Sequence, residues 1–408
     1  MSALAPFGVR SFRFQWPADL ATSWAFEMEA LILGWYILTT TGSVQQLVIV
    51  AALGWLGTLL SPFFGVVGDR VGHRTLLCAT RGAYALLAAV LAGLTLSGTL
   101  QPWHVFAITA LGGLMRPSDM VMRHVLVGQT MRPGMLLGAL GISRTTSDTA
   151  RVIGAFAGAG GVALVGMGPA YVVVTAMYVA AFLLTLGVAG KQPSSVQVAP
   201  AHPLADLKQG FSYVWHKPDL LGALALAFLV NLLAYPFVLG LLPYAAKEVY
   251  AVGQSGLGYL AAAFWSGALA GSLLVGAGSF RLRAARAMLW SGTLWFAATL
   301  LFGQTTAFPL GLALLFAAGF VQSFCLTPLA AVMLRSTEES MRGRVMGVRM
   351  LAIWGLPLGL LVAGPLIALL GYAATTFLYT ALGLAATVAI AWRWREALWH
   401  RSAAANAA

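Results

Sequence analysis

Residues 65–74 read GVVGDRVGHR and form a short charged stretch between two long apolar runs. The run before it covers residues 45–67, and the run after it covers residues 76–97. A helix that crosses a bilayer needs about 20 mostly apolar residues, so each run is long enough to span one. The charged residues between the two runs would then lie in a tight loop at one membrane surface.

The same pattern continues along the whole chain. Of its 408 residues, 60% are hydrophobic and only 9% are charged, whereas soluble domains carry roughly 25% charged residues. The apolar runs are too long and continuous for barrel strands, which alternate over about 10 residues. We therefore predict an all-α, polytopic membrane protein with twelve transmembrane helices. The predicted spans are residues 14–39, 45–67, 76–97, 103–122, 137–165, 168–189, 219–242, 256–278, 287–303, 308–334, 350–370 and 373–391.

The net charge of +12 raises the question of a nucleic-acid partner, but its distribution argues against one. Basic residues gather in the termini and in alternate loops, whereas the opposite loops hold only Lys247. Because cytoplasmic loops collect Lys and Arg, we predict a multi-pass protein of a cytoplasmic (inner) membrane with both termini cytoplasmic. The basic residues on the predicted cytoplasmic side are Arg10, Arg13, Arg70, Arg74, Arg132, Lys191, Lys208, Lys217, Arg281, Arg283, Arg335, Arg342, Arg344, Arg393, Arg395 and Arg401.

The longest polar stretch, residues 190–218, lies at the middle of the chain. It begins rich in Pro and Ser, like a linker, and then becomes amphipathic at helical spacing. We predict an N-terminal six-helix bundle over residues 1–190 and a cytoplasmic linker with an amphipathic helix over 191–218. A C-terminal six-helix bundle and a cytoplasmic tail are predicted over 219–408.

Several kinds of chemistry find no support in the sequence. The first apolar run is long and is interrupted by Asp19, Glu27 and Glu29, so we expect an uncleaved span rather than a signal peptide. Cys78 and Cys325 give neither a disulfide framework nor a metal-binding spacing. Nucleophile-elbow and phosphate-loop motifs do not occur either. We therefore expect no enzyme activity, no metal and no cofactor.

The stretch at 65–74 resembles the G-x-x-x-D-R-x-G-R-R signature of the major facilitator superfamily, with His73 in place of an Arg. The resemblance implies two six-helix bundles that alternate access to a substrate site. It also implies that this loop acts as a conformational latch. The latch residues would be Gly65, Asp69, Arg70, Gly72 and Arg74.

Other stretches resemble one branch of that superfamily, the enterobactin-exporter-like (transmembrane secretion effector) proteins. These stretches are Trp35–Leu38 with Thr41–Ser43, Asp148–Gly154, and Arg342–Gly347. The second departs from the branch pattern, because Asp148 replaces an Asn and Ala155 replaces a Pro. The missing Pro weakens the argument that the direction of transport is export.

Charged residues inside two of the spans form a pattern of their own. They are Arg116, Asp119 and Arg123 in the fourth span, and Arg144, Asp148 and Arg151 in the fifth. Each set lies on one helical face in the order plus, minus, plus, so two antiparallel helices would present matching charges at matching depths. A lone charge at mid-membrane costs at least about 2.5–3.5 kcal/mol, which implies mutual pairing or a wet cavity.

This set carries a net charge of +2, and two acids in the first span can balance it. Glu27 and Glu29 are two residues apart and therefore point to different sides of their helix. We predict that a proton-coupling group is drawn from these acids and the charges that face them. The predicted group is Glu27, Glu29, Asp119, Asp148, Arg116, Arg144 and Arg151.

The second half contains almost no charge within its spans, and its interruptions are polar or aromatic, among them Trp265. We predict that this half supplies an apolar, aromatic wall for the substrate. The predicted substrate-binding residues are Trp24, Asn231, Tyr235, Gln322 and Trp354.

The function expected from these features is secondary active transport of an amphipathic small molecule by alternating access, as a proton-coupled efflux antiporter. The expected partners are the substrate, protons and the lipid bilayer, and the protein is expected to be monomeric. Two alternatives stay open: uptake or uncoupled facilitative transport, and a non-transporting receptor or scaffold of the same fold.

The predicted topology can be checked by cysteine labelling in a background that lacks Cys78 and Cys325. A membrane-impermeant maleimide added from outside should label a cysteine placed at Lys247 and should not label one placed at Lys208 or Arg401. The reverse pattern would invert the topology.

Overall fold

The structure is a computed structural model that describes residues 5–131, 133–189, 203–276, 284–338 and 341–399. Within these ranges every regular element is helical and no strand occurs. The side chains of a few residues inside helices also lie outside the described part, and these include Asp69, Arg144 and Arg342. The all-α prediction is confirmed for the described chain.

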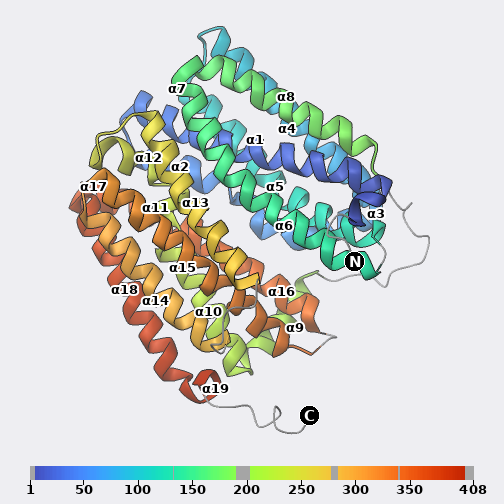
Figure 1. The fold of residues 1–408 in the computed structure, drawn as a ribbon, viewed down its shortest axis with the longest axis vertical. Coiled ribbons are helices and arrows are strands. Elements are labelled where there is room, and N and C mark those ends of the chain that lie inside the picture. Colours follow the sequence, from blue (N-terminus) through green and yellow to red (C-terminus); the bar gives the residue numbers. More distant parts are fainter. Residues whose placement is uncertain (1–4, 132, 190–202, 277–283, 339–340, 400–408) are drawn as a thin grey trace. The chain divides into compact units, whose positions relative to one another are not determined.

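The chain divides into two compact units, which are described separately. The first consists of Met1–Ala201 with Ala251–Ala262, and the second of His202–Tyr250 with Ala263–Ala408. Figure 1 shows the helices of the first unit in blue to green. They are α1 (Arg10–Thr41), α2 (Val44–Leu53), η2 (Leu56–Leu60), α3 (Ser61–Val71), α4 (His73–Leu96), α5 (Pro102–Thr130), α6 (Pro133–Ala155), η3 (Phe156–Gly160), α7 (Gly161–Val165) and α8 (Met167–Leu186), with the short η1 (Ala5–Gly8) before them.

The second unit is drawn in yellow-green to red (Figure 1), and α13 begins in the first unit and continues into the second. Its long helices are α9 (Pro203–Trp215), α10 (Pro218–Leu233), α13 (Gln254–Gly276), α14 (Ala284–Gln304), α15 (Phe308–Arg335), α16 (Arg342–Leu351), α17 (Gly355–Leu370) and α18 (Tyr372–Arg393). The short elements are α11 (Pro236–Leu239), α12 (Leu242–Tyr244), η4 (Ala245–Val249), η6 (Ala352–Trp354) and α19 (Arg395–Trp399). The predicted amphipathic helix corresponds to α9, while the linker residues before it lie outside the described part.

Seven helices in the described chain are long and apolar enough to cross a membrane, or eight if the bent pair α9–α10 counts as one. Helices α1 and α5 are not among them, because the charged residues that they carry lower their mean hydropathy. The chain is thus a multi-pass membrane protein, and the number of twelve spans stays a prediction.

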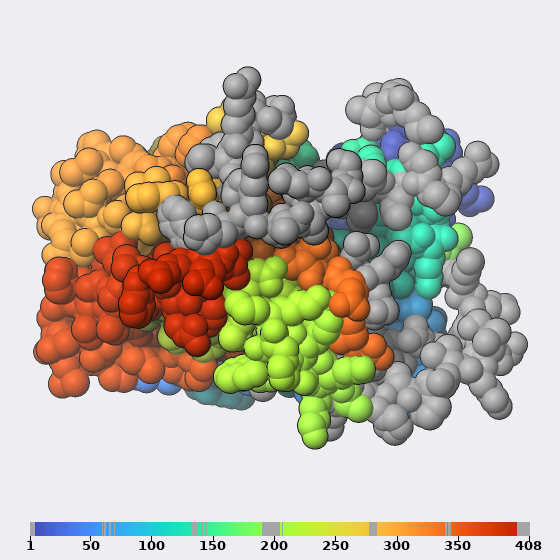
Figure 2. Space-filling view, turned by 90° about the horizontal axis from the view of Figure 1, so that it is seen from below, coloured from blue at the N-terminus to red at the C-terminus, as the bar shows by residue number. Residues whose placement is uncertain are grey.

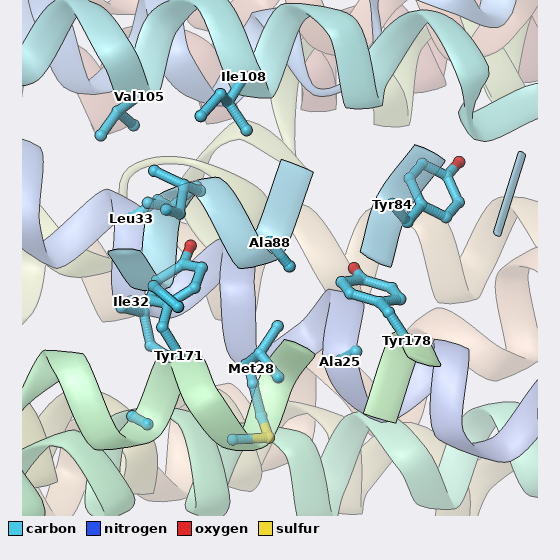
Figure 3. Close-up of a cluster of buried hydrophobic side chains, with 14 of the residues drawn as sticks. Ala25, Met28, Ile32, Leu33, Tyr84, Ala88, Val105, Ile108, Tyr171 and Tyr178 are labelled. Carbon is cyan, nitrogen blue, oxygen red and sulfur yellow. The ribbon is translucent and has the colours of Figure 1, made fainter. Parts of the chain in front are cut away.

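The core of the first unit lies between α1, α4, α5 and α8 (Figure 3). In this view Ile32, Leu33 and Tyr171 lie together at one end of the core, and Tyr84 and Tyr178 lie at the other end. Burying aromatic side chains contributes a large apolar area, but each hydroxyl needs a polar partner. The core therefore mixes apolar packing with buried polar groups.

The second predicted span is not one continuous helix. It breaks at Gly54 and Trp55, between α2 and η2, where the backbone tightens into a 3₁₀ turn. A Cβ at Gly57 would lie 2.3 Å from the carbonyl oxygen of Leu114, and a Cβ at Gly113 would lie 2.0 Å from that of Leu53. The break is therefore held against α5 by backbone contacts that only glycine permits.

Helix α9 contacts the rest of the second unit at two places. A Cβ at Gly210 would lie 2.9 Å from the carbonyl oxygen of Arg344 in α16, and Figure 2 shows the light-green surface of α9 beside the orange α16. Beyond the helix, Lys217 donates to Glu338 Oε1 at 3.2 Å and to the Tyr213 hydroxyl at 2.5 Å. The bond from Lys217 lowers the pKa of the Glu338 carboxyl below its ordinary value. On the same helix, Phe211 is 49% exposed.

Gly112 and Gly113 form a matched pair that tests the contact between α5 and the break in the second span. Gly113→Ala should destabilise the protein by about 1–3 kcal/mol, because its Cβ meets a backbone carbonyl that cannot rotate away. Gly112→Ala meets nothing within 4 Å and should leave the melting temperature unchanged or raise it slightly. Equal melting temperatures for the two variants in detergent would contradict the close contact.

Candidate functional site

Most of the charged stretch at residues 65–74 belongs to the ends of two helices. The turn between these helices is a single residue, Gly72. Helix α3 ends at Val71 and α4 begins at His73, and Gly72 joins them with φ of 95°. Side chains with a Cβ rarely adopt such a positive φ, so glycine is required here. The sequence prediction of a tight turn is confirmed at Gly72.

The basic residues of this loop have different surroundings. Arg74 donates to the backbone carbonyl of Leu186, the last residue of α8, where a positive charge is favourable at a helix C-terminus. Arg70 is exposed, and the side chain of Asp69 lies outside the described part. The roles of Gly65, Asp69, Arg70, Gly72 and Arg74 as a latch therefore stay a prediction.

A buried ion network joins α1, α4 and α5. The carboxylate of Asp119 lies at its centre. Arg81 in α4 donates through Nε to Asp119 Oδ1 at 3.0 Å, and Arg123 donates through Nε to Oδ2 at 3.0 Å. A second nitrogen of Arg81 pairs with Asp19 in α1. We call Asp19, Arg81, Asp119 and Arg123 the Asp119 cluster. Arg81 and Asp119 are fully buried.

The remaining donors of this cluster also have partners. Arg81 donates to the Thr185 hydroxyl at 2.7 Å, and Arg123 donates to the Ser23 hydroxyl at 3.2 Å. With two acids and two guanidinium groups the cluster is formally neutral. Buried charges are tolerated when they are paired and hydrogen-bonded, so the cluster ties the three helices together without leaving a lone charge.

A second ion network joins α1 to α6. Arg151 Nε lies 3.4 Å from Glu27 Oε1, and Arg151 Nη1 lies 3.4 Å from Asp148 Oδ1. We call Glu27, Asp148 and Arg151 the Glu27 cluster. Unlike the Asp119 cluster it is partly open, because the Glu27 side chain is 21% exposed and the Arg151 side chain 30%.

Two glycines of α6 and η3 bring this second network together. A Cβ at Gly154 would lie 2.7 Å from Glu27 Cβ, and a Cβ at Gly158 would lie 2.7 Å from Met28 Cα. Glycine at these two positions therefore lets α6 and η3 approach α1 closely. Gly160 and Gly161, in contrast, face open space.

Glu29 faces a different helix from Glu27, as the two-residue spacing predicts. It accepts a hydrogen bond from the Tyr178 hydroxyl of α8 at 2.9 Å. Tyr178 packs against Tyr84 and Phe26, with ring centroids 5.5 Å and 5.8 Å apart. Glu29 thus lies beside the aromatic part of the core, and Glu27 lies beside α6.

Arg116, in the middle of α5, belongs to neither cluster. Its guanidinium carbon lies 4.1 Å from the centre of the Trp55 ring and 5.1 Å from that of Phe26. Each such cation–π contact is worth about 0.5–2 kcal/mol, and together they offset much of the roughly 2.5–3.5 kcal/mol that an arginine costs at mid-membrane. The sequence pattern did not identify Trp55 or Phe26 as partners.

The described pairs differ from the arrangement expected for the fourth and fifth spans. We expected the charges of these two helices to face each other at matching depths. Instead, Asp119 is shared between Arg81 and Arg123, and the ion pair of Glu27 joins α6 to α1. Arg144 cannot be placed, because its side chain lies outside the described part. The reason is that α4 and α1 also carry buried charges, at Arg81 and Asp19, which the sequence pattern did not assign.

The predicted substrate residues of the second unit fall into separate groups. Gln322 is 5% exposed and donates to the Tyr235 hydroxyl at 2.7 Å, and Tyr235 packs edge-on against the buried Trp295 at 4.9 Å. The Asn231 amide instead donates to the carbonyl of Ala227 in its own helix. Trp354 lies at the end of η6.

Several polar atoms of the predicted substrate residues, and one of Trp295, are buried without a hydrogen bond in the described chain. They are the indole nitrogens of Trp24, Trp295 and Trp354 and the amide oxygen of Gln322. Buried polar atoms normally have a partner, which a water or a bound molecule can supply. Within the described residues, no group of three or more His, Cys, Asp or Glu side chains is placed to hold a metal ion.

The Asp119 cluster generates a charge-balance prediction. Arg81→Gln should destabilise the protein by about 3–5 kcal/mol, because it leaves two buried carboxylates against one guanidinium. Adding Asp19→Asn restores formal neutrality, and the double variant should melt at a higher temperature than Arg81→Gln alone. Additive losses would mean that water, rather than Arg81, balances Asp19.

Comparison with known proteins agrees with this architecture. Residues 16–282 match the Major Facilitator Superfamily. No curated protein matches the chain in sequence. Among solved structures, a bacterial homolog of the human lysosomal transporter Spinster superposes with a TM-score of 0.73 at 13% identity, covering 95% of this chain and 97% of its own.

Two further solved structures are similar. The nucleoside transporter NupG has a TM-score of 0.71 at 12% identity and covers 95% of this chain and 100% of its own. The human organic anion transporter MFSD10 has a TM-score of 0.65 at 18% identity and covers 93% and 99%. At these identities the likeness shows the fold alone, and the branch of the family suggested by sequence is not confirmed. The family match covers more than half of the chain, and the protein therefore belongs to the Major Facilitator Superfamily, a family of membrane transporters rather than enzymes.

Proposed function

We propose that this protein is a proton-coupled secondary transporter that exports an amphipathic small molecule across the cytoplasmic membrane by alternating access. The observation that carries the proposal is the Glu27 cluster. Among the described side chains it combines two carboxylates and one guanidinium inside a helix bundle, and it is partly open whereas the Asp119 cluster is closed. The three solved transporters named above are consistent with the general activity and give no direction or substrate.

A proton at Glu27 would change the interactions that join α1 to α6. The charged carboxylate attracts Arg151, whereas a protonated carboxyl loses most of that attraction. Arg151 would then keep its contact with Asp148. A change of pairing between two packed helices favours one conformation over another, which is what coupling of a proton to a transport cycle requires.

The Asp119 cluster is the less suitable proton site. Each of its carboxylates is held by at least one buried guanidinium, and Asp119 accepts from two. Two cations stabilise the charged form of a carboxylate and therefore oppose protonation. We assign this cluster a structural role in holding α1, α4 and α5 together.

The substrate would be bound partly by the aromatic and amide groups of the second unit. Tyr235, Gln322 and Trp295 form a connected group, and the Gln322 amide oxygen has no hydrogen bond in the described chain. A molecule with an apolar body and a few polar groups would match this composition. Trp24 and Trp354 remain candidates through their unsatisfied indole nitrogens.

The test of proton coupling is Glu27→Gln, which mimics the protonated carboxyl. In proteoliposomes, a panel of fluorescent amphipathic compounds is first screened for flux with and without an imposed pH gradient. We expect Glu27→Gln to abolish the gradient-driven part of the flux and to leave binding of the transported compound within about threefold. Glu248→Gln, which removes an exposed carboxylate from the second unit, should behave like the unchanged protein.

Other results would favour the alternatives. Flux that ignores the pH gradient in the unchanged protein would indicate facilitative transport, and gradient-driven accumulation in the opposite direction would indicate uptake. Binding without any flux would favour a receptor. If Glu27→Gln still accumulates the compound at the original rate, Glu27 has a structural role, and Asp119 or Asp148 becomes the better candidate.

A further inference from the structure

The side chain of Arg116 is a charged group in the middle of α5 whose hydrogen-bonding capacity is unused. Within the described residues it makes no hydrogen bond, and no carboxylate lies within 4.0 Å of its nitrogens. Arg81 and Arg123, by contrast, each bond to a carboxylate and to a hydroxyl. Arg116 thus differs from the two arginines of the Asp119 cluster.

The contacts that Arg116 does make are with two aromatic rings. The Trp55 and Phe26 rings lie 4.1 Å and 5.1 Å from its carbon. Aromatic rings interact with the flat face of a guanidinium, whereas its N–H donors point outward in the plane. Contacts with aromatic rings leave the N–H donors of Arg116 without an acceptor among the described residues, so these donors remain for a ligand.

Both rings are held in place by the fold. Trp55 lies at the break of the second span, which Gly57 and Gly113 press against α5 beside Arg116. Phe26 packs edge-on against Tyr84 at 5.0 Å and against Tyr178 at 5.8 Å. Irregular backbone at membrane depth is tolerated where it is buried in protein, and here the break holds Trp55 beside Arg116.

The two acids of α1 that interact with Arg116 through their charge have closer partners of their own. Glu27 lies 3.4 Å from Arg151 Nε, and Glu29 accepts a hydrogen bond from the Tyr178 hydroxyl at 2.9 Å. The Arg116 side chain is only partly buried, so a ligand from the surrounding space can reach it. A planar fork of N–H donors matches the two oxygens of a carboxylate or phosphate.

We infer that Arg116, flanked by Trp55 and Phe26, is the residue that binds an anionic group of the transported molecule, a carboxylate or another oxyanion next to an apolar body. This inference rests on the proposed function, because it names the chemical class of the substrate. The same chemistry is offered by a soluble organic anion and by the headgroup of an anionic lipid. The two aromatic rings beside the guanidinium favour a molecule whose oxyanion is attached to a flat apolar group.

The test measures binding, without transport or a pH gradient, so its failure is distinct from that of the proposed function. The full chain is placed in phosphatidylcholine nanodiscs and titrated calorimetrically with 2-naphthoate, 2-naphthyl phosphate and 2-naphthalenesulfonate. 2-Naphthamide serves as the neutral counterpart. At least one anion should bind more tightly than the amide. Arg116→Gln should lower the affinity for that anion about 10- to 100-fold and change the affinity for the amide less than about twofold.

Two further variants keep the result interpretable. Arg116→Lys retains the charge but loses the planar fork, so the affinity for the anion should fall by an intermediate factor. If Arg116→Gln does not fold, the test uses Arg116→Lys. Arg393→Gln removes one exposed positive charge at the end of α18 and should leave anion binding unchanged. An equal loss in Arg393→Gln and Arg116→Gln would reduce the effect to net charge and overturn the inference.

The lipid composition of the nanodiscs distinguishes a soluble organic anion from an anionic lipid headgroup as the ligand. If an anionic lipid occupies the site, nanodiscs containing phosphatidylglycerol should weaken naphthoate binding in the unchanged protein and have no effect in Arg116→Gln. If a soluble anion is the ligand, naphthoate should bind equally in both kinds of nanodisc. No preference of any of the three anions over the amide, or a preference that survives in Arg116→Gln, would overturn the assignment.

Discussion

The first unit depends on a single electrostatic constraint, namely that charge inside an apolar bundle must be balanced within hydrogen-bonding distance. Asp119 satisfies this constraint by accepting from Arg81 and Arg123, and Arg81 extends the network to Asp19. A carboxylate shared by two guanidinium groups fixes the distances between α1, α4 and α5. The charged residues of these helices are thus part of the packing, in the same way that the aliphatic side chains are.

The interior charges divide into three environments with different chemical capacities. The Asp119 cluster is closed and formally neutral, because its two carboxylates are balanced by two guanidinium groups. The Glu27 cluster is partly open, and its pairs are longer, at 3.4 Å. Arg116 has aromatic neighbours in place of a close carboxylate. A closed network, a partly exposed network and a cation between two aromatic rings lie within one helix bundle, and close glycine contacts position the last two.

The fold class could be predicted from sequence because it follows from hydropathy and spacing, which are local properties. The apolar runs at residues 76–97 and 168–189 correspond to α4 and α8, and the turn at Gly72 follows from the loop motif. The irregular parts of the spans were not predicted. The break at Gly54 and Trp55 and the π-helical turn at Phe156–Gly160 lie inside apolar runs, and no local signal separates them from continuous helix.

The sequence by itself determined that this is a helical membrane protein with a charged loop motif, and that Glu27 and Glu29 face different sides of α1. Helical periodicity places residues on faces, which is why these conclusions did not need coordinates. Only the tertiary structure decided which charges meet. Arg81 and Asp19 lie 62 residues apart in sequence, and Arg81 and Asp119 lie 38 apart. Periodicity carries no information about which face of one helix packs on which face of another, so the partners of Asp119, Glu27 and Arg116 became known only from the packing of α1, α4, α5 and α6.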